Sequence, residues 1–349
     1  MGQARSGFFF ALSTVVLWGA LFLTACAIVD VPVGPSPPGR IQEKRAETRI
    51  YRSREFVVYF PGGKEDTPAR LAKRFLGDPS KAWVIEDANE GKSFPPGRPV
   101  IIPLQVRNRG GLERRGYQVV PVLCYHRFSG TCRTPLCMPA GVFEAQMSLL
   151  KEQGYRIIPM RDLLDFLYYR KGLPKRSVVL TIDDGHRSTY EIAYPILKKF
   201  GFTATLFVYT DFVGVSDSAV TWTHLRDMQR AGFAVGSHTV THCDLTEKEP
   251  GEDDSVYLER IQEELLGSKR IIDRELDRET LYLAYPYGHY DQRILRLSEK
   301  SGYKMAFSVK RGSNPFFADP LALKRRQILA QDMGRFERDL QTFYPFDLR

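Results

Sequence analysis

Apolar runs alternate with segments of helical periodicity along the last two thirds of the sequence. The clearest helical segment, at 255–274, carries its apolar side chains at helical spacing. Short apolar runs between helices predict parallel strands, and strands that are apolar on both faces suggest a closed barrel. We expect strands at 119–123, 177–182, 204–208, 233–235, 281–285 and 305–309, and helices at 141–153, 189–199, 223–230 and 255–274.

A second, shorter pattern occupies residues 51–106. The run 56–59 is rich in β-branched and aromatic side chains, which favours a strand. Thr67 can cap a helix that has proline in its first turn, and a second short helix is expected at 82–88. The run 100–103 predicts a final strand. The order strand, helix, helix, strand indicates a small domain that precedes the barrel.

The first residues are typical of an export signal. Residues 8–23 form an almost unbroken apolar run, which suits a signal-peptide core better than a membrane span with flanking charges. The run ends in Leu-Thr-Ala-Cys, which resembles the lipobox of bacterial lipoproteins and implies that Cys26 is lipidated. An uncleaved membrane anchor is the alternative. We expect a signal peptide at 1–25 and a tether at 26–50, whose Pro/Gly-rich stretch 31–39 would form a semi-rigid spacer.

This signal predicts an exported protein that a lipid anchors to a membrane of the cell envelope. In a Gram-negative host, Ala27 in place of Asp would favour the outer membrane facing the periplasm. Export also affects the cysteines, because Cys132 and Cys137 could then form a disulfide within one loop. Two free thiols are equally compatible with their spacing. Cys124 and Cys243 are expected to be buried packing residues.

Composition and charge exclude one class of partner. The chain has 349 residues, enough for one large domain and a small one, and carries a formal net charge of +9. A basic balance can indicate nucleic acid, an anionic membrane or an acidic polymer. The Lys and Arg residues are scattered along the chain, and no recognised nucleic-acid-binding motif accompanies them. We therefore expect no nucleic-acid partner.

Residues that can bind a metal follow two of the predicted strands. Asp183 and Asp184 come directly after one strand, and His238 and His242 follow another. In parallel barrels, chemistry gathers at the carboxyl ends of the strands. The two histidines are four residues apart, so a helical turn would put both rings on one side. Two imidazoles and one carboxylate form an open site for a catalytic divalent metal, most readily Zn²⁺, although Ni²⁺, Co²⁺ or Fe²⁺ would also accept them.

These motifs resemble those of the polysaccharide deacetylases of the NodB-homology type, also called carbohydrate esterase family 4. Thr-Ile-Asp-Asp-Gly at 181–185 matches their first motif with Ile in place of Phe, and His-Thr-Val-Thr-His at 238–242 matches the second. The resemblance implies a distorted (β/α) barrel at 117–349 in the α/β class. It also implies that Asp183 is the general base and that Asp184, His238 and His242 bind the metal.

A third motif is matched in part by Tyr285, Pro286 and Tyr287, followed by glycine. The resemblance implies that these residues border the substrate, and that a backbone N–H near Tyr287 helps to hold the tetrahedral oxyanion. Many members have an arginine that orients the base two residues before the proline. Here that position is Ala284, so another cation must serve. The candidates are Lys324, Arg325 and Arg326, which follow a predicted strand.

The general acid also departs from the family pattern. Many members supply a histidine from a C-terminal motif, but this chain has none after His289. We favour His126, which follows the first predicted barrel strand; a packed structural histidine is the alternative. Tyr125-His126 and Ala-Tyr-Pro-Tyr-Gly at 284–288 resemble a subgroup that acts on exopolysaccharide, including poly-β-1,6-N-acetylglucosamine deacetylases.

The small domain at 51–106 resembles a LysM domain, which implies binding to glycans built on N-acetylglucosamine, such as peptidoglycan. A spacer without ligand affinity is the alternative. Glu65 stands where a glycine usually precedes Asp-Thr, so the binding loop would be altered. The matching residues are Asp66, Thr67, Leu71, Ala72, Phe75, Leu76, Gly77, Asp78, Trp83, Ile85, Asn89, Pro96, Gly97, Ile101, Ile102 and Pro103.

The sequence thus predicts a metal-dependent N-deacetylase of an N-acetylated glycan polymer. Exopolysaccharide such as poly-β-1,6-N-acetylglucosamine is favoured as substrate, with peptidoglycan next. One rival hypothesis is a glycan-binding lipoprotein with an inactive barrel, and another is an O-acetyl polysaccharide esterase with the same site.

Overall fold

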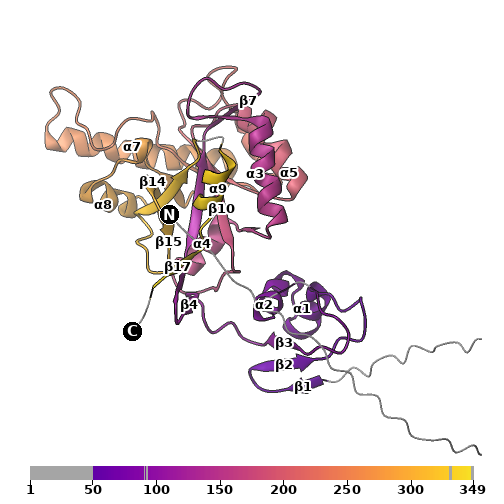
Figure 1. Cartoon of the computed structure of the whole chain (residues 1–349). Coiled ribbons are helices and arrows are strands. Elements are labelled where there is room, and N and C mark those ends of the chain that lie inside the picture. Colours follow the sequence, from indigo (N-terminus) through magenta and orange to yellow (C-terminus); the bar gives the residue numbers. More distant parts are fainter. Residues whose placement is uncertain (1–49, 90, 92, 330–331, 347–349) are drawn as a thin grey trace, which may run out of the picture. The chain divides into compact units, whose positions relative to one another are not determined.

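The computed structural model describes residues 50–89, 91, 93–329 and 332–346 (Figure 1). The predicted signal peptide, the lipidation site Cys26 and nearly all of the tether lie outside the described residues. Among the residues that are described, no helix is both long and apolar enough to cross a membrane.

The small N-terminal module is a three-stranded antiparallel sheet covered by helices, in strand order β1-β2-β3. The predicted order of strand, helix, helix, strand is present, and the pattern missed only the edge strand β1. The Thr67 hydroxyl accepts a hydrogen bond from the Arg70 backbone N–H and caps α1, as predicted. The elements are β1 (Ile50–Arg52), β2 (Phe56–Tyr59), α1 (Pro68–Leu76), a 3₁₀ turn (Pro79–Lys81), α2 (Ala82–Ala88) and β3 (Val100–Pro103).

This module has its own hydrophobic core, in which Val57 and Ile102 of the sheet pack against Leu71 and Ile85 of the helices. The Asn89 side chain joins the end of α2 to β3, because its amide both donates to and accepts from the Ile101 backbone. Alternate strand residues face this core, as expected for a sheet covered on one side.

The large unit is a closed barrel of seven parallel strands; the sequence predicts a parallel barrel and six of these strands. Each barrel strand pairs with the barrel strand that comes next in the sequence, and pairing of the last, β16, with the first, β6, closes the ring. Both β6 and β10 are buried along their whole length, which explains why their sequences are mostly apolar and do not alternate with charged residues. The barrel strands are β6 (Val120–Tyr125), β10 (Ser177–Ile182), β11 (Thr205–Val208), β12 (Ala234–Ser237), β13 (Tyr282–Ala284), β14 (Met305–Arg311) and β16 (Leu323–Gln327).

Four barrel strands each end one residue before a predicted site residue. β6 ends before His126, β10 before Asp183, β12 before His238 and β13 before Tyr285. Because the strands are parallel, these four positions share the carboxyl edge of the barrel. The predicted location of Arg325 is wrong in one respect, since it lies inside β16 and not after it.

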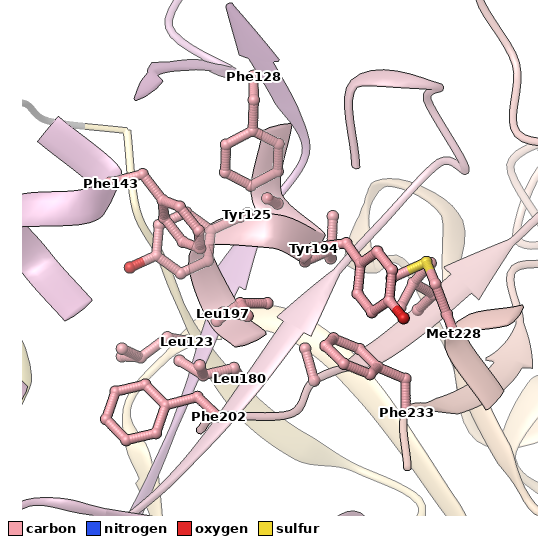
Figure 2. Packing of buried hydrophobic residues seen from close by; sticks show 14 of the residues in the cluster. Leu123, Tyr125, Phe128, Phe143, Leu180, Tyr194, Leu197, Phe202, Met228 and Phe233 are labelled. Carbon is pink, nitrogen blue, oxygen red and sulfur yellow. The ribbon is translucent and has the colours of Figure 1, made fainter. Parts of the chain in front are cut away.

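Helices cover the outside of the barrel. Outward residues of the strands, such as Leu123 and Leu180, join Phe143 of α3 and Leu197 of α5 in the largest hydrophobic cluster (Figure 2). Three helices, α4, α8 and α9, were not predicted from the sequence. The helices are α3 (Ala140–Glu152), α4 (Met160–Leu167), a π-helical turn (Thr189–Ala193) that leads into α5 (Tyr194–Phe200), α6 (Trp222–Arg230), α7 (Asp254–Leu276), a 3₁₀ turn (Pro286–Gly288), α8 (Gln292–Lys300) and α9 (Met333–Asp339).

Short strands complete the unit at both edges of the barrel. β17, β5 and β4 form a separate antiparallel sheet, β7 pairs with β8, β15 adds to β6, and β9 adds to β10. They are β4 (Leu112–Glu113), β5 (Gly116–Gln118), β7 (Arg127–Ser129), β8 (Cys137–Pro139), β9 (Arg156–Ile157), β15 (Ser313–Asn314) and β17 (Phe343–Pro345).

Candidate active site

The most buried part of the site is an ion pair at the end of β10. Arg325 Nη1 donates to Asp183 Oδ1 and Nη2 donates to Oδ2, both at 2.7 Å, and both side chains are almost fully buried. Burial alone would raise the pKa of Asp183, but the Arg325 guanidinium outweighs it and lowers that pKa. The carboxylate is therefore ionised, and Arg325 replaces the cation that is missing at Ala284.

The other two predicted orienting cations do not serve this role. Arg326 points to the opposite side of β16, where its Nη1 lies 2.9 Å from Asp339 Oδ1. Lys324 is exposed. Side chains alternate across a strand, so only the middle residue of the three reaches the inside of the barrel.

Asp184 points away from its neighbour and toward two histidines. Its Oδ1 lies 3.6 Å from His238 Nε2 and 3.7 Å from His242 Nε2. Burial would raise the pKa of Asp184, but hydrogen bonds from His186 and His238 lower it well below its ordinary value. A positive φ of 74° at Asp184 turns its side chain out of line with the strand.

The segment that carries the two histidines is not helical, and the predicted helical turn is wrong. It is an irregular loop in which Thr239 and His242 both have positive φ values, 73° and 66°. The two rings still meet, with centroids 4.6 Å apart. Left-handed backbone conformations in this loop therefore bring the two rings together, as we had expected a helical turn to do.

Asp184, His238 and His242 fit a divalent metal. Their candidate ligand atoms all lie within 4.8 Å of one another. Ligands bound at about 2.1 Å around a tetrahedral ion are about 3.4 Å apart, close to the distances between Asp184 Oδ1 and the two Nε2 atoms. His238 Nδ1 donates to the Ala284 carbonyl at 2.7 Å, which orients the ring so that Nε2 faces Asp184 and could bind an ion in place of its proton.

The pKa values of the two histidines are shifted in opposite directions. Burial and the nearby His238 lower the pKa of His242 to about 4, so its ring is neutral at physiological pH. Burial also disfavours the charged form of His238, but the hydrogen bond to Asp184 and the two carboxylates raise its pKa. The site thus concentrates negative charge around His238, which is where a cation would be stabilised.

His126 lies at the same edge of the barrel and is 9% exposed. The chain on either side of His126 is held in place, because the rings of Tyr125 and Phe128 both pack against the ring of Phe143, at centroid distances of 5.0 and 4.7 Å. Burial lowers the pKa of His126, and the charges of Asp183 and Asp184 oppose this only in part. The ring is therefore neutral in the free protein.

The predicted substrate-binding motif divides into two parts. Tyr287 is 56% exposed, has a positive φ of 57°, and its ring lies 4.9 Å from the His242 ring. Tyr285 is fully buried, and its hydroxyl donates to the Leu321 carbonyl, so its side chain belongs to the core and not to the site. Pro286 is also buried, and it opens the turn that presents Tyr287.

Sequence reasoning assigned no role to two groups that contact the carboxylates. The Cys124 thiol, expected as a packing residue, is buried and lies 3.4 Å from Asp183 Oδ2. Burial raises the pKa of this thiol well above its ordinary value, so it is a hydrogen-bond donor. His186 Nε2 lies 3.5 Å from Asp184 Oδ2. The Asp-Asp-Gly-His order places His186 near the metal ligands in the sequence, but no such signal exists for Cys124.

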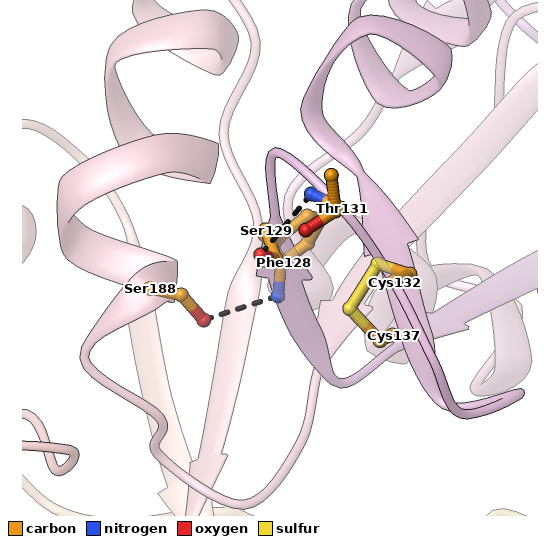
Figure 3. Close-up of a disulfide and its surroundings, with 6 residues drawn as sticks. All are labelled: Phe128, Ser129, Thr131, Cys132, Cys137 and Ser188. Carbon is orange, nitrogen blue, oxygen red and sulfur yellow. Dashed lines mark hydrogen bonds between the residues drawn. A yellow bond between two sulfur atoms is a disulfide. The ribbon is translucent and has the colours of Figure 1, made fainter.

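A disulfide joins Cys132 and Cys137 in the loop that follows His126 (Figure 3). Of the two states compatible with the sequence, the structure has the bonded one. Phe128 N–H donates to the Ser188 hydroxyl at 3.0 Å, which ties this loop to the segment after Asp184. Cys243 is only half-buried, in contrast to the prediction, and Cys124 is buried as predicted.

Comparison with known sequences supports the relationship that the motifs indicate. Residues 170–306 match the polysaccharide deacetylase family. YxkH of Bacillus subtilis (strain 168), whose name assigns it to polysaccharide deacetylases, is 30% identical over 194 residues, which are 56% of this chain and 66% of that protein. The poly-beta-1,6-N-acetyl-D-glucosamine N-deacetylase of Staphylococcus aureus (strain MRSA252) is 30% identical over 175 residues, 48% of this chain and 59% of that protein. The chain thus spans 59% to 66% of the length of these relatives.

The fold has matches among solved structures. The Streptococcus pyogenes deacetylase PplD, solved in complex with acetate, superposes with a TM-score of 0.55 at 26% identity, over 60% of this chain and 92% of that chain. The barrel is therefore a homologue of polysaccharide deacetylases in both sequence and fold.

Proposed function

We propose that this protein is a metal-dependent hydrolase that removes N-acetyl groups from an N-acetylglucosamine polysaccharide. One observation carries the proposal: a buried carboxylate held by Arg325 lies beside a separate three-residue set that fits a divalent metal. Hydrolysis of an amide needs both a base for water and an electrophile for the carbonyl. Adjacent residues, Asp183 and Asp184, would divide these two tasks.

A divalent ion held by Asp184, His238 and His242 would polarise the acetamide carbonyl and acidify a nearby water. Asp183 accepts the proton from that water. Its oxygens each accept one bond from Arg325, but an ionised carboxylate has about four acceptor sites, so a lone pair remains available. Arg325 fixes the plane of the carboxylate and keeps it charged until the water approaches.

His126 would donate a proton to the departing amine. Because burial lowers its pKa, the ring is neutral before the reaction and must gain its proton during turnover. Asp183 is the available source, since it has just accepted a proton from the water. The backbone N–H near Tyr287 would complete the oxyanion site. Acetate and a glucosamine amine would be the products.

The substrate class is inferred from the relatives and from the small module. The S. aureus relative is named for poly-β-1,6-N-acetylglucosamine, and we favour such an exopolysaccharide, with peptidoglycan next. The LysM-like module would hold the enzyme on peptidoglycan, and lipidation of Cys26 would attach it to the envelope membrane. Zn²⁺ is the expected ion, because two imidazoles and one carboxylate with an open position are typical of catalytic zinc sites.

Acetate release tests the proposal. The zinc-loaded chain from Ala27 onward would be assayed on β-1,6- and β-1,4-linked N-acetylglucosamine oligomers, on peptidoglycan and on an O-acetylated glycan, with Asp183→Asn as control. We expect release from N-acetylated polymer that depends on Asp183. Release only from the O-acetylated glycan would instead identify an esterase, and binding without any release would identify a glycan-binding protein with an inactive barrel.

A further inference from the structure

The loop that carries His242 holds an unfavourable backbone conformation. Thr239 and His242 are non-glycine residues with positive φ, a conformation that L-residues rarely adopt. Such a loop needs hydrogen bonds from its surroundings to keep the two histidine rings close to each other. Thr239 supplies part of this support, because its hydroxyl accepts a hydrogen bond from the His242 N–H at 3.1 Å. The backbone carbonyls of Thr239 and Val240 also accept hydrogen bonds, from the N–H groups of Thr210 and Asp211.

The side-chain support for the middle of the loop comes from Glu264 on helix α7. Its Oε2 accepts hydrogen bonds from the Val240 N–H at 2.9 Å and the Thr241 N–H at 3.0 Å, and its Oε1 accepts one from the Thr241 hydroxyl at 2.8 Å. Glu264 is only 7% exposed. A carboxylate this buried is retained when it is fully hydrogen-bonded, and here every bond goes to the two residues between Thr239 and His242.

Helix α7 is built to approach this loop closely. At Gly267 a Cβ atom would lie 3.2 Å from Val240 Cγ2, so glycine allows the helix to contact the loop. One residue further, the Ser268 hydroxyl lies 2.7 Å from the Ser237 hydroxyl, which itself accepts from the Thr239 N–H at 3.1 Å. The helix therefore holds both ends of the loop.

We propose that Glu264 is a positioning residue of the metal site, which clamps the loop backbone so that His242 stays within reach of the ion bound by His238 and Asp184. The inference rests on the proposed metal site, but not on the deacetylase activity. Residues behind metal ligands typically change metal affinity by about 10–100-fold when they are replaced. Glu264→Ala should therefore weaken zinc binding by about 10–100-fold.

The test is a zinc titration of the full chain, purified in detergent, against a chromophoric chelator. Glu263→Ala is the matched control, because Glu263 is the preceding residue on the same helix and its side chain is 66% exposed. Glu264→Gln should bind zinc almost as wild type does, since its amide oxygen can accept the two N–H bonds and Thr241 can accept from its amide nitrogen. Glu264→Ala with unchanged zinc affinity would overturn the proposal, as would equal losses in Glu264→Gln and Glu264→Ala.

Two further measurements separate positioning from folding. Amide hydrogen exchange at Val240 and Thr241 should accelerate in Glu264→Ala, while the melting temperature of the metal-free chain should change far less than zinc affinity; unchanged exchange would contradict the clamp. If Glu264→Ala does not fold, Thr241→Val removes one clamp bond alone and should cost about 2–10-fold in zinc affinity, and no loss would contradict the clamp.

The zinc titration also distinguishes this inference from the proposed function. Zinc binding by the wild type without acetate release would reject the activity and leave the role of Glu264 intact. No zinc binding by the wild type would reject the metal site and the clamp together.

Discussion

Asp183 and Asp184 are neighbours in the chain, yet they belong to two parts of the site that are built in different ways. The base corner consists of Asp183, Arg325 and Cys124, all on barrel strands or directly after one, and all almost completely buried. The metal corner consists of Asp184, His238 and His242, and two of these three lie in the left-handed region of backbone conformation.

The two corners differ in which groups balance the charge of their carboxylate. The base corner carries its own counter-ion, so the Asp183–Arg325 pair is complete in the folded chain. In the metal corner the Asp184 carboxylate faces two histidine rings, and His242 is neutral because burial and the nearby His238 lower its pKa to about 4. The base corner should therefore depend on the integrity of the fold, and the metal corner on the ion and on the loops that hold its ligands.

The largest expected effect is on turnover, from Asp183→Asn. Loss of a general base typically costs about 10²–10⁴-fold in rate, which is up to about 5.5 kcal/mol of transition-state stabilisation. Zinc affinity should stay close to that of the wild type, because Asp183 is not a ligand. Acetate release and zinc titration on the same preparation check both parts, and full retained activity would remove Asp183 from its role.

Next comes the stability cost of separating the buried pair. Arg325→Met leaves a buried carboxylate without its partner and should lower the free energy of unfolding by about 3–5 kcal/mol. The double variant Asp183→Asn with Arg325→Met should recover much of this loss, because neither charge is then left alone. Urea unfolding of the metal-free proteins measures both values. Additive losses in the double variant would show that the two side chains do not act as a pair.

In the metal corner, we expect substitution to reduce zinc affinity strongly and metal-free stability only a little. His242→Ala removes a metal ligand. Replacing a residue that only supports a ligand costs up to about 100-fold in metal affinity, or about 2.7 kcal/mol, and His242→Ala should weaken zinc binding by more than this. Its effect on the metal-free stability should be small, because the ring is partly exposed and its loop is held by other residues. The comparison between the two corners fails if His242→Ala destabilises the metal-free chain as much as Arg325→Met does.

The smallest effect is on the pH dependence of stability. The pKa of Asp183 is lowered in the folded chain, so its contribution is present above the ordinary value of 3.8 and is lost as pH falls through the folded value. Each unit of lowering corresponds to about 1.4 kcal/mol. Between pH 5 and pH 3, stability should therefore fall more steeply in the wild type than in the double variant at residues 183 and 325. The free energy of unfolding, measured by urea denaturation at each pH, checks this. An equal fall with pH in the two proteins would contradict the expectation.

Much of the site could be predicted from local sequence. Asp183, Asp184 and His238 follow short runs rich in apolar residues that predict strands, and parallel strands bring their carboxyl ends to one edge. His126 follows the same rule on the first barrel strand, and it does lie at that edge. The resemblance of the motifs to polysaccharide deacetylases then provided the roles, which remain predictions for this chain.

The errors arose where a local pattern was extended to a side-chain position. A spacing of four residues suggested a helical turn for His238 and His242, but left-handed residues bring the rings together in a loop. The Ala-Tyr-Pro-Tyr-Gly motif suggested that Tyr285 borders the substrate. Its ring instead packs in the core between the barrel and the helices, with Ile261 of α7 and Ile294 of α8. Only Tyr287 is exposed near the metal corner.

The sequence by itself determined the barrel, the strand ends and the identity of the acidic and histidine residues there. Tertiary structure alone decided which distant groups support them. Arg325 lies 142 residues from Asp183 in the chain, and Cys124 lies 59 residues from it. No local pattern can relate them, because Cys124 reaches Asp183 only when β6 pairs with β10, and Arg325 reaches it only when β16 pairs with β6 and the barrel closes. Closure also selects Arg325 over Lys324 and Arg326, since a strand sends alternate side chains to opposite faces.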